Sequence, residues 1–147
     1  MLIGFFDIQS FTKKLVLESS FSSMDAVEKM LAGLREQHAI AEEKYAAIWI
    51  VLNEAITNAI RHGNKFDPAK KVQLKIKLIK NRYLRFRIRD EGAGFDPSAV
   101  PDPTSAQRIA EPEGRGIFLM KKLADTILYS DFGKTLEIVF DLQKNVD

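Results

Sequence analysis

Three polar side chains recur at intervals of four residues in the stretch LNEAITNAIRHGNK, residues 52–65. They are Glu54, Asn58 and His62, and this spacing places them on one side of a helix. A carboxylate can accept a proton from a hydroxyl group, and a carboxamide oxygen can coordinate Mg²⁺, a hard cation that shares oxygen ligands with phosphates. Glu54 and Asn58 are therefore candidates for a site that handles phosphates. For His62 we favour a simpler role, as a helix-end residue that packs or caps locally.

A glycine-rich segment, DEGAGFDP, follows an expected strand at residues 90–97. Asp90 opens this segment, and it is followed by Gly92 and Gly94. Two glycines within three residues permit a positive φ and let another group approach the backbone closely. A turn capped by an aspartate has the same sequence features. Taken alone, the segment leaves a structural and a ligand-binding interpretation open.

A second glycine pair, Gly114 and Gly116, precedes the apolar run IFLM. Glycines just before a helix let backbone N–H groups face a ligand at the positive end of the helix, which is a common way to hold phosphate. A plain turn before a helix has the same residues. The chain contains no GxxxxGK[ST] segment, which excludes a Walker-type phosphate loop.

Two helices are predicted before the first glycine-rich segment. Apolar residues spaced by three and four within residues 24–34 predict an amphipathic helix, with Ser23 as its N-cap. The next helix is expected from about Ala41 to Arg61, because this segment lacks Gly and Pro and is rich in helix-forming residues. Its middle, AAIWIVL, is apolar on every side, so the helix should be central and buried. Gly63 is expected to end it.

A β-hairpin is predicted over residues 71–80 and 83–90, where apolar residues alternate with Lys, Arg and Gln on either side of Asn81-Arg82. Further strands are expected at residues 13–20 and, near the C-terminus, in the runs TILYS and TLEIVFDL on either side of a turn. Hairpins with one apolar face need helices on that face and can leave the other face in water. The pattern predicts an α+β fold, a two-layer α/β sandwich whose mixed sheet is mostly antiparallel, with helices on one face.

The segment between the hairpin and the C-terminal strands contains a long irregular region. Residues 96–113 hold four of the five prolines and show little periodicity. A loop of this length is more commonly functional or mobile than a simple connection. A helix is expected to follow it over residues 114–125, after the second glycine pair.

The composition limits the class of protein. The 147 residues are 46% hydrophobic and 29% charged with a formal net charge of +2, which predicts one soluble globular domain over residues 1–147. The absence of cysteine excludes disulfides, thiolate metal sites and cysteine nucleophiles. The N-terminus lacks the features of a signal peptide, and no apolar run is long enough to cross a bilayer. We therefore expect a cytoplasmic protein with no membrane partner.

The polar side of the predicted hairpin is basic: it consists of Lys71, Lys75, Lys77, Arg85, Arg87 and Arg89. Such a face is most often simply solvated, and it also discourages aggregation through strand edges. The alternative is a docking surface for an acidic partner, with salt-dependent association. Direct nucleic-acid binding is not expected, because no recognition motif or interleaved aromatic residues accompany the charges.

The segments NEAITNAIRHGN, RDEGAGF and EGRGIFLM, in this order, together resemble the ATP-binding domain of the GHKL superfamily, the Bergerat fold. The first matches the N box and the others match the first and second glycine boxes. GKT, at 133–135, is similar to a degenerate third box that lacks its second glycine. The resemblance covers about residues 15–142. Within the superfamily, the small size and the form of the N box are most similar to bacterial anti-sigma factor serine kinases.

This resemblance implies that the chain binds ATP and Mg²⁺. Asp90 would accept a hydrogen bond from the adenine amino group, and Gly92 and Gly94 would shape the adenine pocket. Thr135 would assist through a water molecule.

The resemblance also assigns roles around the phosphates. Asn58 would hold the Mg²⁺, and Glu54 would be the general base that takes the proton of a substrate serine. Gly114, Arg115 and Gly116 would meet the phosphates, and residues 96–113 would form a lid. This division of labour suits phosphoryl transfer, which depends on positioning and charge neutralisation.

The implied partners are a sigma factor and an anti-anti-sigma protein of the STAS fold, whose serine would be phosphorylated. A homodimer is a further expectation from the resemblance. Two alternatives stay open at this stage. One is a binding module that captures a partner in an ATP-dependent manner without kinase activity. The other is a detached catalytic domain of a histidine kinase, although neither His38 nor His62 lies in a recognisable phospho-acceptor helix.

Overall fold

The computed structural model describes residues 11–95 and 112–146, with residues 112–115 described as backbone only. In chain order the elements are β1 (Phe11–Glu18), the 3-10 turn η2 (Phe21–Ser23), α1 (Met24–His38), α2 (Glu42–Asn58), the π turn η3 (Ala59–Gly63), β2 (Lys71–Ile79), β3 (Tyr83–Arg89), α4 (Pro112–Leu123), β4 (Thr126–Ser130) and β5 (Thr135–Asp141). The predicted loop at 96–113 lies almost entirely outside the described residues.

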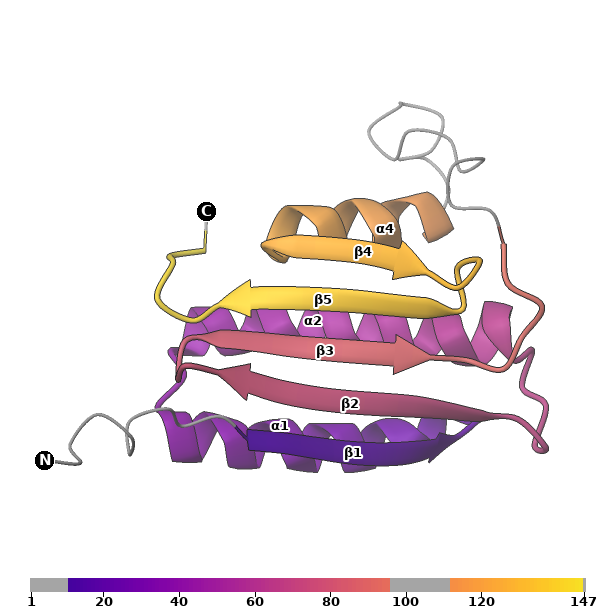
Figure 1. Ribbon diagram of the computed structural model, residues 1–147, viewed down its shortest axis with the longest axis horizontal. Coiled ribbons are helices and arrows are strands. Elements are labelled where there is room, and N and C mark those ends of the chain that lie inside the picture. The colour runs from indigo at the N-terminus through magenta and orange to yellow at the C-terminus, as the bar shows by residue number, and fades with distance from the viewer. Residues whose placement is uncertain (1–10, 96–111, 147) are drawn as a thin grey trace, which may run out of the picture.

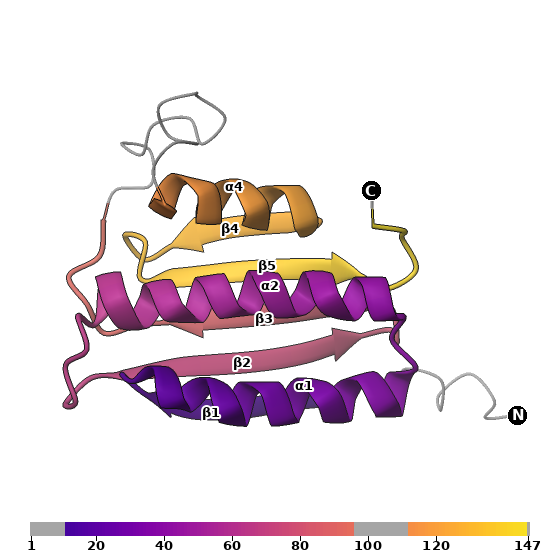
Figure 2. The same ribbon diagram turned by 180° about the vertical axis from the view of Figure 1, so that it is seen from behind.

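The described strands form one five-stranded sheet in the order β1-β2-β3-β5-β4, and every neighbouring pair is antiparallel. Figure 1 views this sheet from its open side, and Figure 2 shows α1, α2 and α4 together on the opposite side. The predicted α+β sandwich with helices on one face is therefore confirmed. Within the described strands the sheet is entirely antiparallel, without the parallel pairing that a mixed sheet would contain.

The core lies between the sheet and the helices. Alternate residues of β2 and β3 are buried and their neighbours exposed, as the sequence alternation predicts. Phe86 and Phe140 are completely buried on adjacent strands, and their rings meet edge to face at 6.2 Å. Helix α2 buries one side along its length, but its apolar middle segment is not buried on every side, because Ala46 and Ile50 are exposed. Helix α2 crosses the centre of the sheet, and its C-terminal polar residues lie at one end of the sheet (Figure 2).

Three local predictions need correction. Ser23 precedes α1 but does not cap it with its side chain; its hydroxyl donates instead to the carbonyl oxygen of Glu18 at 2.9 Å. The first hairpin turns at Lys80-Asn81, where both residues have φ near +53°, because a two-residue turn with this twist fits the flanking strands. Helix α4 begins at Pro112, before both glycines, since proline suits the first turn of a helix.

No helix within residues 11–95 and 112–146 combines the length and apolar character that a membrane crossing requires.

Candidate functional site

A cavity of about 500 Å³ opens where the C-terminal end of α2 meets the loop that follows β3. The starts of α4 and β5 reach the same end of the molecule, on the right in Figure 1. The lining combines apolar side chains with polar and charged ones, as a ligand with a flat ring and charged groups requires. The lining residues are Ala55, Asn58, Ala59, His62, Gly63, Lys65, Ile88, Asp90, Ala93, Gly94, Phe95, Ile117, Met120, Tyr129, Gly133, Lys134 and Leu136.

The three polar residues spaced by four, Glu54, Asn58 and His62, lie in two different environments. Asn58 lies on the cavity wall, and so does His62, which we expected to have only a local packing role. Glu54, one turn earlier, is half-buried and lies outside the lining. Its carboxylate packs against the backbone of Gly116 in α4, where a Cβ atom would overlap with it. The structure therefore separates Asn58, at the cavity, from Glu54, at the contact between two helices.

Asp90 lies directly after β3 and lines the cavity. Its Oδ1 accepts a hydrogen bond from the backbone N–H of Gly92 at 2.8 Å, while Oδ2 accepts none from the described residues. Burial raises the pKa of the Asp90 carboxyl, and the Gly92 N–H and the charges of Lys134 and Lys70 offset only part of this rise. One carboxylate oxygen of Asp90 therefore lies in a partly buried site and accepts no hydrogen bond from the described residues.

Glycines allow the loop after β3 to pack tightly against the end of α2. A Cβ atom on Gly63 would lie 2.5 Å from the Asp90 carboxyl group, and one on Gly92 would overlap with the Gly63 carbonyl oxygen. Gly94 has φ of +80°, a conformation that other residues rarely adopt. Gly92 is buried but absent from the cavity lining, whereas Gly94 contributes to it. The first glycine box thus determines where the Asp90 carboxylate lies.

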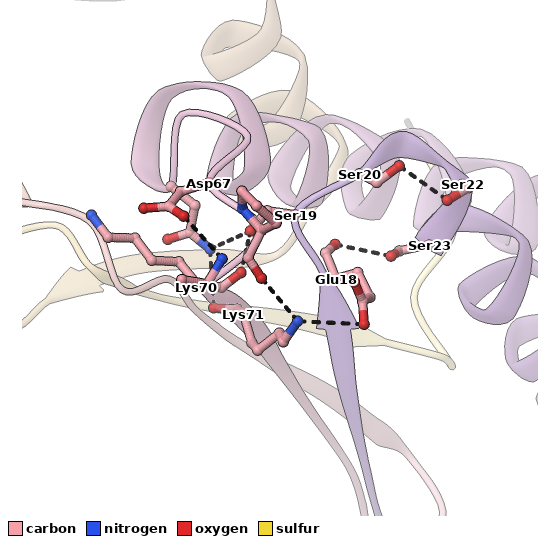
Figure 3. A network of polar contacts seen from close by, with 11 residues as sticks. Glu18, Ser19, Ser20, Ser22, Ser23, Asp67, Lys70 and Lys71 are labelled. Atoms are coloured by element: carbon pink, nitrogen blue, oxygen red, sulfur yellow. Dashed lines mark hydrogen bonds and ion pairs between the residues drawn. The ribbon is translucent and has the colours of Figure 1, made fainter.

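Asn64 fixes the position of the same loop from the other side. It is 1% exposed, and its Oδ1 accepts a hydrogen bond from the Glu91 N–H at 2.7 Å. Its Nδ2 donates to the Ser19 hydroxyl and to the Lys71 carbonyl oxygen, both at 3.0 Å. The Ser19 hydroxyl in turn donates to the Lys70 carbonyl oxygen, and Figure 3 shows this contact within the polar network around Ser19. Asn64 therefore connects the end of α2 to three other parts of the chain.

Asn64 was not predicted to have a separate role, although it lies in the same motif. The local structure explains why the sequence pattern did not predict a positioning role for Asn64. The π turn η3 ends at Gly63, with the Asn64 N–H bonded to the Ala59 carbonyl oxygen at 2.8 Å, and π turns are common at functional sites. An asparagine just past a helix usually indicates an ordinary cap. Only the three-dimensional contacts identify it as a positioning residue.

Thr135 is the first residue of β5 and is 1% exposed. Its hydroxyl is the one buried side-chain polar atom in the described residues that has no hydrogen-bond partner. Buried hydroxyl groups normally have a partner, and a bound water or ligand commonly provides it. The residue is not in the cavity lining, but Lys134 and Leu136 on either side of it are. The structure does not place this hydroxyl in the cavity, so its expected role of assisting through a water stays a prediction.

Four further lining residues were not assigned to the site from the sequence. Lys65 and Lys134 add positive charge to the wall, and Phe95 and Tyr129 add a pair of rings in edge-to-face contact at 5.3 Å. Burial raises the pKa of the Tyr129 phenol, and the negative charge of Glu54 raises it further. Lys65, Phe95 and Lys134 lie within or beside the motif segments without an assigned role, and Tyr129 lies outside them, so only the fold shows that all four line the cavity.

The remaining predicted residues lie partly outside the described region. Gly114 and Arg115 fall within the first turn of α4, and the structure describes their backbone alone. Of the predicted lid, residues 96–111 lie outside the described residues, and they include its one arginine, Arg108. The predicted phosphate contacts of the second glycine box therefore stay predictions.

Comparisons with known proteins show which family the chain resembles. An anti-sigma F factor from Shouchella clausii is 35% identical over 88 residues, which cover 58% of this chain and 59% of that protein. An anti-sigma F factor from Anoxybacillus flavithermus is 30% identical over 110 residues, covering 70% and 73%. The serine-protein kinase RsbW of Listeria innocua is 27% identical over 113 residues, covering 70% and 69%. The first match thus spans little more than half the length of the relative.

A solved structure shares the fold. The histidine kinase domain of the blue-light activated histidine kinase from Erythrobacter litoralis EL346 superposes with a TM-score of 0.51 at 16% identity, covering 83% of this chain and 60% of that one. Residues 17–140, most of the chain, match the family described as the histidine kinase-like ATPase domain. The protein therefore belongs to the histidine kinase-like ATPase domain family, of the GHKL type.

Proposed function

We propose that the protein binds ATP in the cavity beside Asp90 and transfers the terminal phosphoryl group to a serine of a regulatory partner protein. The observation that carries the proposal is the Asp90 carboxylate, which lines the cavity and has one oxygen without a hydrogen bond from the described residues. The carboxyl is partly buried, and a ligand that donates a hydrogen bond to this oxygen would stabilise its charged form. The amino group of an adenine is such a donor.

The surroundings of Asp90 support adenine as the ring that binds there. Ile88, Met120 and Leu136 provide an apolar lining, and the backbone at Gly94 lies on the same wall. Thr135, with its orphaned hydroxyl, would complete the polar contacts through a water. Binding pockets for a nucleotide base are usually apolar, with a few polar atoms at one end.

The polyphosphate would lie nearer Asn58 and the lysines of the wall. The carboxamide oxygen of Asn58 can coordinate Mg²⁺, which when bound neutralises phosphate charge and holds the terminal phosphate in position. Lys65 and Lys134 line the cavity and would add positive charge. This charge would matter because the predicted lid contains a single arginine, Arg108. Gly114, Arg115 and Gly116 would add contacts from the start of α4.

Glu54 is the proposed general base. As the oxygen of the partner's serine bonds to phosphorus and the bond to the ADP oxygen breaks, the hydroxyl proton would pass to the Glu54 carboxylate. Glu54 lies beside α4 and outside the cavity lining, so the serine would approach from that side. The absence of a side chain at position 116 leaves the room that the Glu54 carboxylate occupies.

The names of the relatives support the class of partner. Two relatives are named anti-sigma F factor and a third is named serine-protein kinase. We therefore propose a STAS-type anti-anti-sigma protein as the phosphorylated partner and a sigma factor as the sequestered one, in the cytoplasm. A homodimer stays an expectation of the family resemblance.

The position of Glu54 also favours a second candidate, a non-catalytic module that captures its partner when ATP is bound. In that case the carboxylate would serve the contact with α4 and no proton transfer. The two candidates differ in one product, since only a kinase leaves phosphoserine on the captured protein.

The test begins with calorimetric titration of the protein with ATP, with and without Mg²⁺. Mg²⁺-dependent binding is expected, and no binding at millimolar ATP would contradict the proposal. The Glu54→Gln variant should then bind MgATP nearly as well as the wild type but transfer no phosphate to a STAS-domain protein. Unchanged transfer would remove Glu54 from its role, and wild-type capture without any phosphoserine would establish the non-catalytic module. An acid-labile product would instead indicate histidine phosphorylation.

A further inference from the structure

The side of the sheet that faces away from the helices carries a concentrated positive charge. Figure 1 shows this side uncovered by any described helix. We define the basic face as the cations whose positions in the strands alternate with the buried ones: Lys14, Lys71, Lys75, Lys77, Arg85, Arg87 and Arg89. Six of these seven side chains belong to exposed residues, and Lys71 is half-buried.

The strand register places like charges directly opposite one another. Lys75 is paired with Lys14 on one side and with Arg87 on the other, and Lys77 is paired with Arg85. Side chains at directly opposite positions lie within reach of each other, so like charges there destabilise a sheet. A face that only had to be soluble could alternate the two signs at no such cost.

Acidic neighbours balance only part of this charge. Lys71 pairs with Glu18 at 3.4 Å, Arg89 with Asp131 at 3.3 Å, and Arg87 with Glu137 at 3.9 Å. The four cations between these pairs, Lys14, Lys75, Lys77 and Arg85, form no ion pair with any residue of the described chain. The centre of the face is thus a cluster of unpaired positive charge.

A shallow groove lies within this cluster. It has a volume of about 90 Å³ and is lined by Lys75, Lys77, Arg85, Arg87 and Glu137. A groove of this size accepts a small anionic group and not a nucleotide. Four cations around it and one carboxylate at its rim favour a carboxylate group over neutral ligands.

We propose that the basic face is a docking surface for an acidic segment of a partner protein, whose carboxylates enter the groove. Two exposed apolar side chains flank the cations on the same face: Val16 is 69% exposed and Leu128 is 58% exposed. An acidic protein segment presents carboxylates beside apolar side chains that can pack on Val16 and Leu128, whereas a nucleic-acid backbone presents phosphates and no such apolar groups. A second copy of the chain is disfavoured, because two basic faces would repel each other.

This inference does not depend on the ATP site, because its residues lie on the other side of the sheet from the helices. The experiment uses fluorescence anisotropy of two labelled probes, a short poly-L-glutamate peptide and a single-stranded oligothymidylate of equal charge. The tested variant is Lys75→Glu with Lys77→Glu. Its matched control is Lys29→Glu with Lys122→Glu, which makes the same change in net charge at exposed positions on α1 and α4.

Wild-type protein should bind the glutamate peptide more tightly than the oligonucleotide, and the binding should weaken as salt is added. The Lys75/Lys77 variant should bind the peptide about tenfold more weakly than the wild type, whereas the control should lose no more than about twofold. Equal losses in both variants would overturn the proposal, since they would reflect net charge alone. Preference for the oligonucleotide, or no peptide binding, would also overturn it.

Folding of the variants is checked by thermal unfolding. Glutamate at position 75 would lie opposite Lys14 and Arg87, and glutamate at position 77 opposite Arg85, so the double variant should be at least as stable as the wild type. If the double variant does not fold, Lys75→Gln against Lys29→Gln makes the same comparison with a quarter of the charge change. Calorimetric titration with MgATP should give the same affinity for all variants that fold.

Discussion

Two aspartates at strand ends, Asp90 after β3 and Asp141 at the end of β5, lie at opposite ends of the same sheet and have opposite electrostatic surroundings. Asp141 receives two hydrogen bonds from the Arg82 guanidinium, at 3.0 and 2.9 Å, and these contacts lower the pKa of its carboxyl to about 2. Burial raises the pKa of Asp90, which has no cation within ion-pair distance among the described residues.

The difference separates a structural carboxylate from one suited to a ligand. Asp141 lies at the end of β5 beside the first hairpin turn, and both of its carboxylate oxygens accept hydrogen bonds from the protein. Asp90 is partly desolvated, and one of its oxygens has no hydrogen bond from the described chain, so a ligand that donates there would stabilise the carboxylate. Perturbed titration in a cavity is a common property of functional sites. The following predictions test this contrast, beginning with the residues that hold Asp90.

Gly92→Ala is expected to have the largest effect. The new methyl group would overlap with the backbone carbonyl oxygen of Gly63, which cannot move without shifting the end of α2. The free energy of unfolding should fall by about 3 kcal/mol, and MgATP binding should be lost. Urea denaturation and calorimetry measure the two effects.

The matched control for this substitution is Gly33→Ala. Gly33 is exposed within α1, and a Cβ atom there would have nothing within 4 Å. Alanine favours helix over glycine, so this variant should gain about 0.5–1 kcal/mol. A loss of stability in both variants, or in neither, would contradict the close contact at Gly92.

Asn64→Ala should have the next largest effect. It removes the acceptor of the Glu91 N–H and the donor to the Lys71 carbonyl oxygen, and both hydrogen bonds are part-buried. A loss of about 2 kcal/mol in unfolding free energy is expected, with weaker ATP binding because the Asp90 loop is no longer held. Asn53→Ala, at an exposed position on α2, should change neither quantity measurably. Full ATP affinity in the Asn64 variant would show that Asp90 is positioned without this residue.

The sequence predicted the fold well because its strands obey simple rules. Alternation over residues 71–80 and 83–90 specified which side of the hairpin is buried, and the apolar middle of the segment 41–61 predicted the central helix. The same reasoning misplaced the start of α4, because the proline at position 112 was assigned to the preceding loop when it belongs to the first turn. Local periodicity determines what is buried, while helix ends depend on single residues.

The site could be predicted only where a motif carried it. Asn58, Asp90 and Gly94 line the cavity as the motifs suggested, whereas the hydrogen bonds of Asn64 and the position of Lys65 on the cavity wall could not be read from the motif. Separation of Glu54 from the cavity wall was also not predictable, because it depends on how α4 packs on α2. Spacing in the sequence indicates which residues share a helix face, but not what that face meets.

Asp90→Asn should weaken nucleotide binding more than any other single change that leaves the fold intact. It preserves the shape of the side chain but replaces a charged acceptor with an amide, and hydrogen bonds to charged groups contribute about 1.5–3 kcal/mol. ATP affinity should therefore fall by about 10- to 100-fold. Asp141→Asn, the control at the opposite end of the sheet, should leave ATP affinity unchanged. Equal effects of the two substitutions would remove the distinction between the two carboxylates.

The smallest expected effect is on the pH dependence of stability. The contributions of Asp90 and Asp141 to stability should change in opposite directions as the pH changes. The folded-state pKa of Asp90 is raised, so its contribution to stability is greatest below the ordinary aspartate pKa and is lost as the pH rises through the raised value. Relative to wild type, Asp90→Asn should therefore become more stable as the pH increases. The folded-state pKa of Asp141 is lowered to about 2, so its contribution is present above the ordinary pKa and is lost as the pH falls towards that value.

Relative to wild type, Asp141→Asn should therefore become less stable as the pH increases. Urea denaturation of the three proteins between about pH 3 and pH 7 gives both differences in unfolding free energy. The two differences should change in opposite directions over this range. If both change in the same direction, then Asp90 is compensated by charges within the protein itself, and the physical reason for expecting a ligand at that carboxylate is lost.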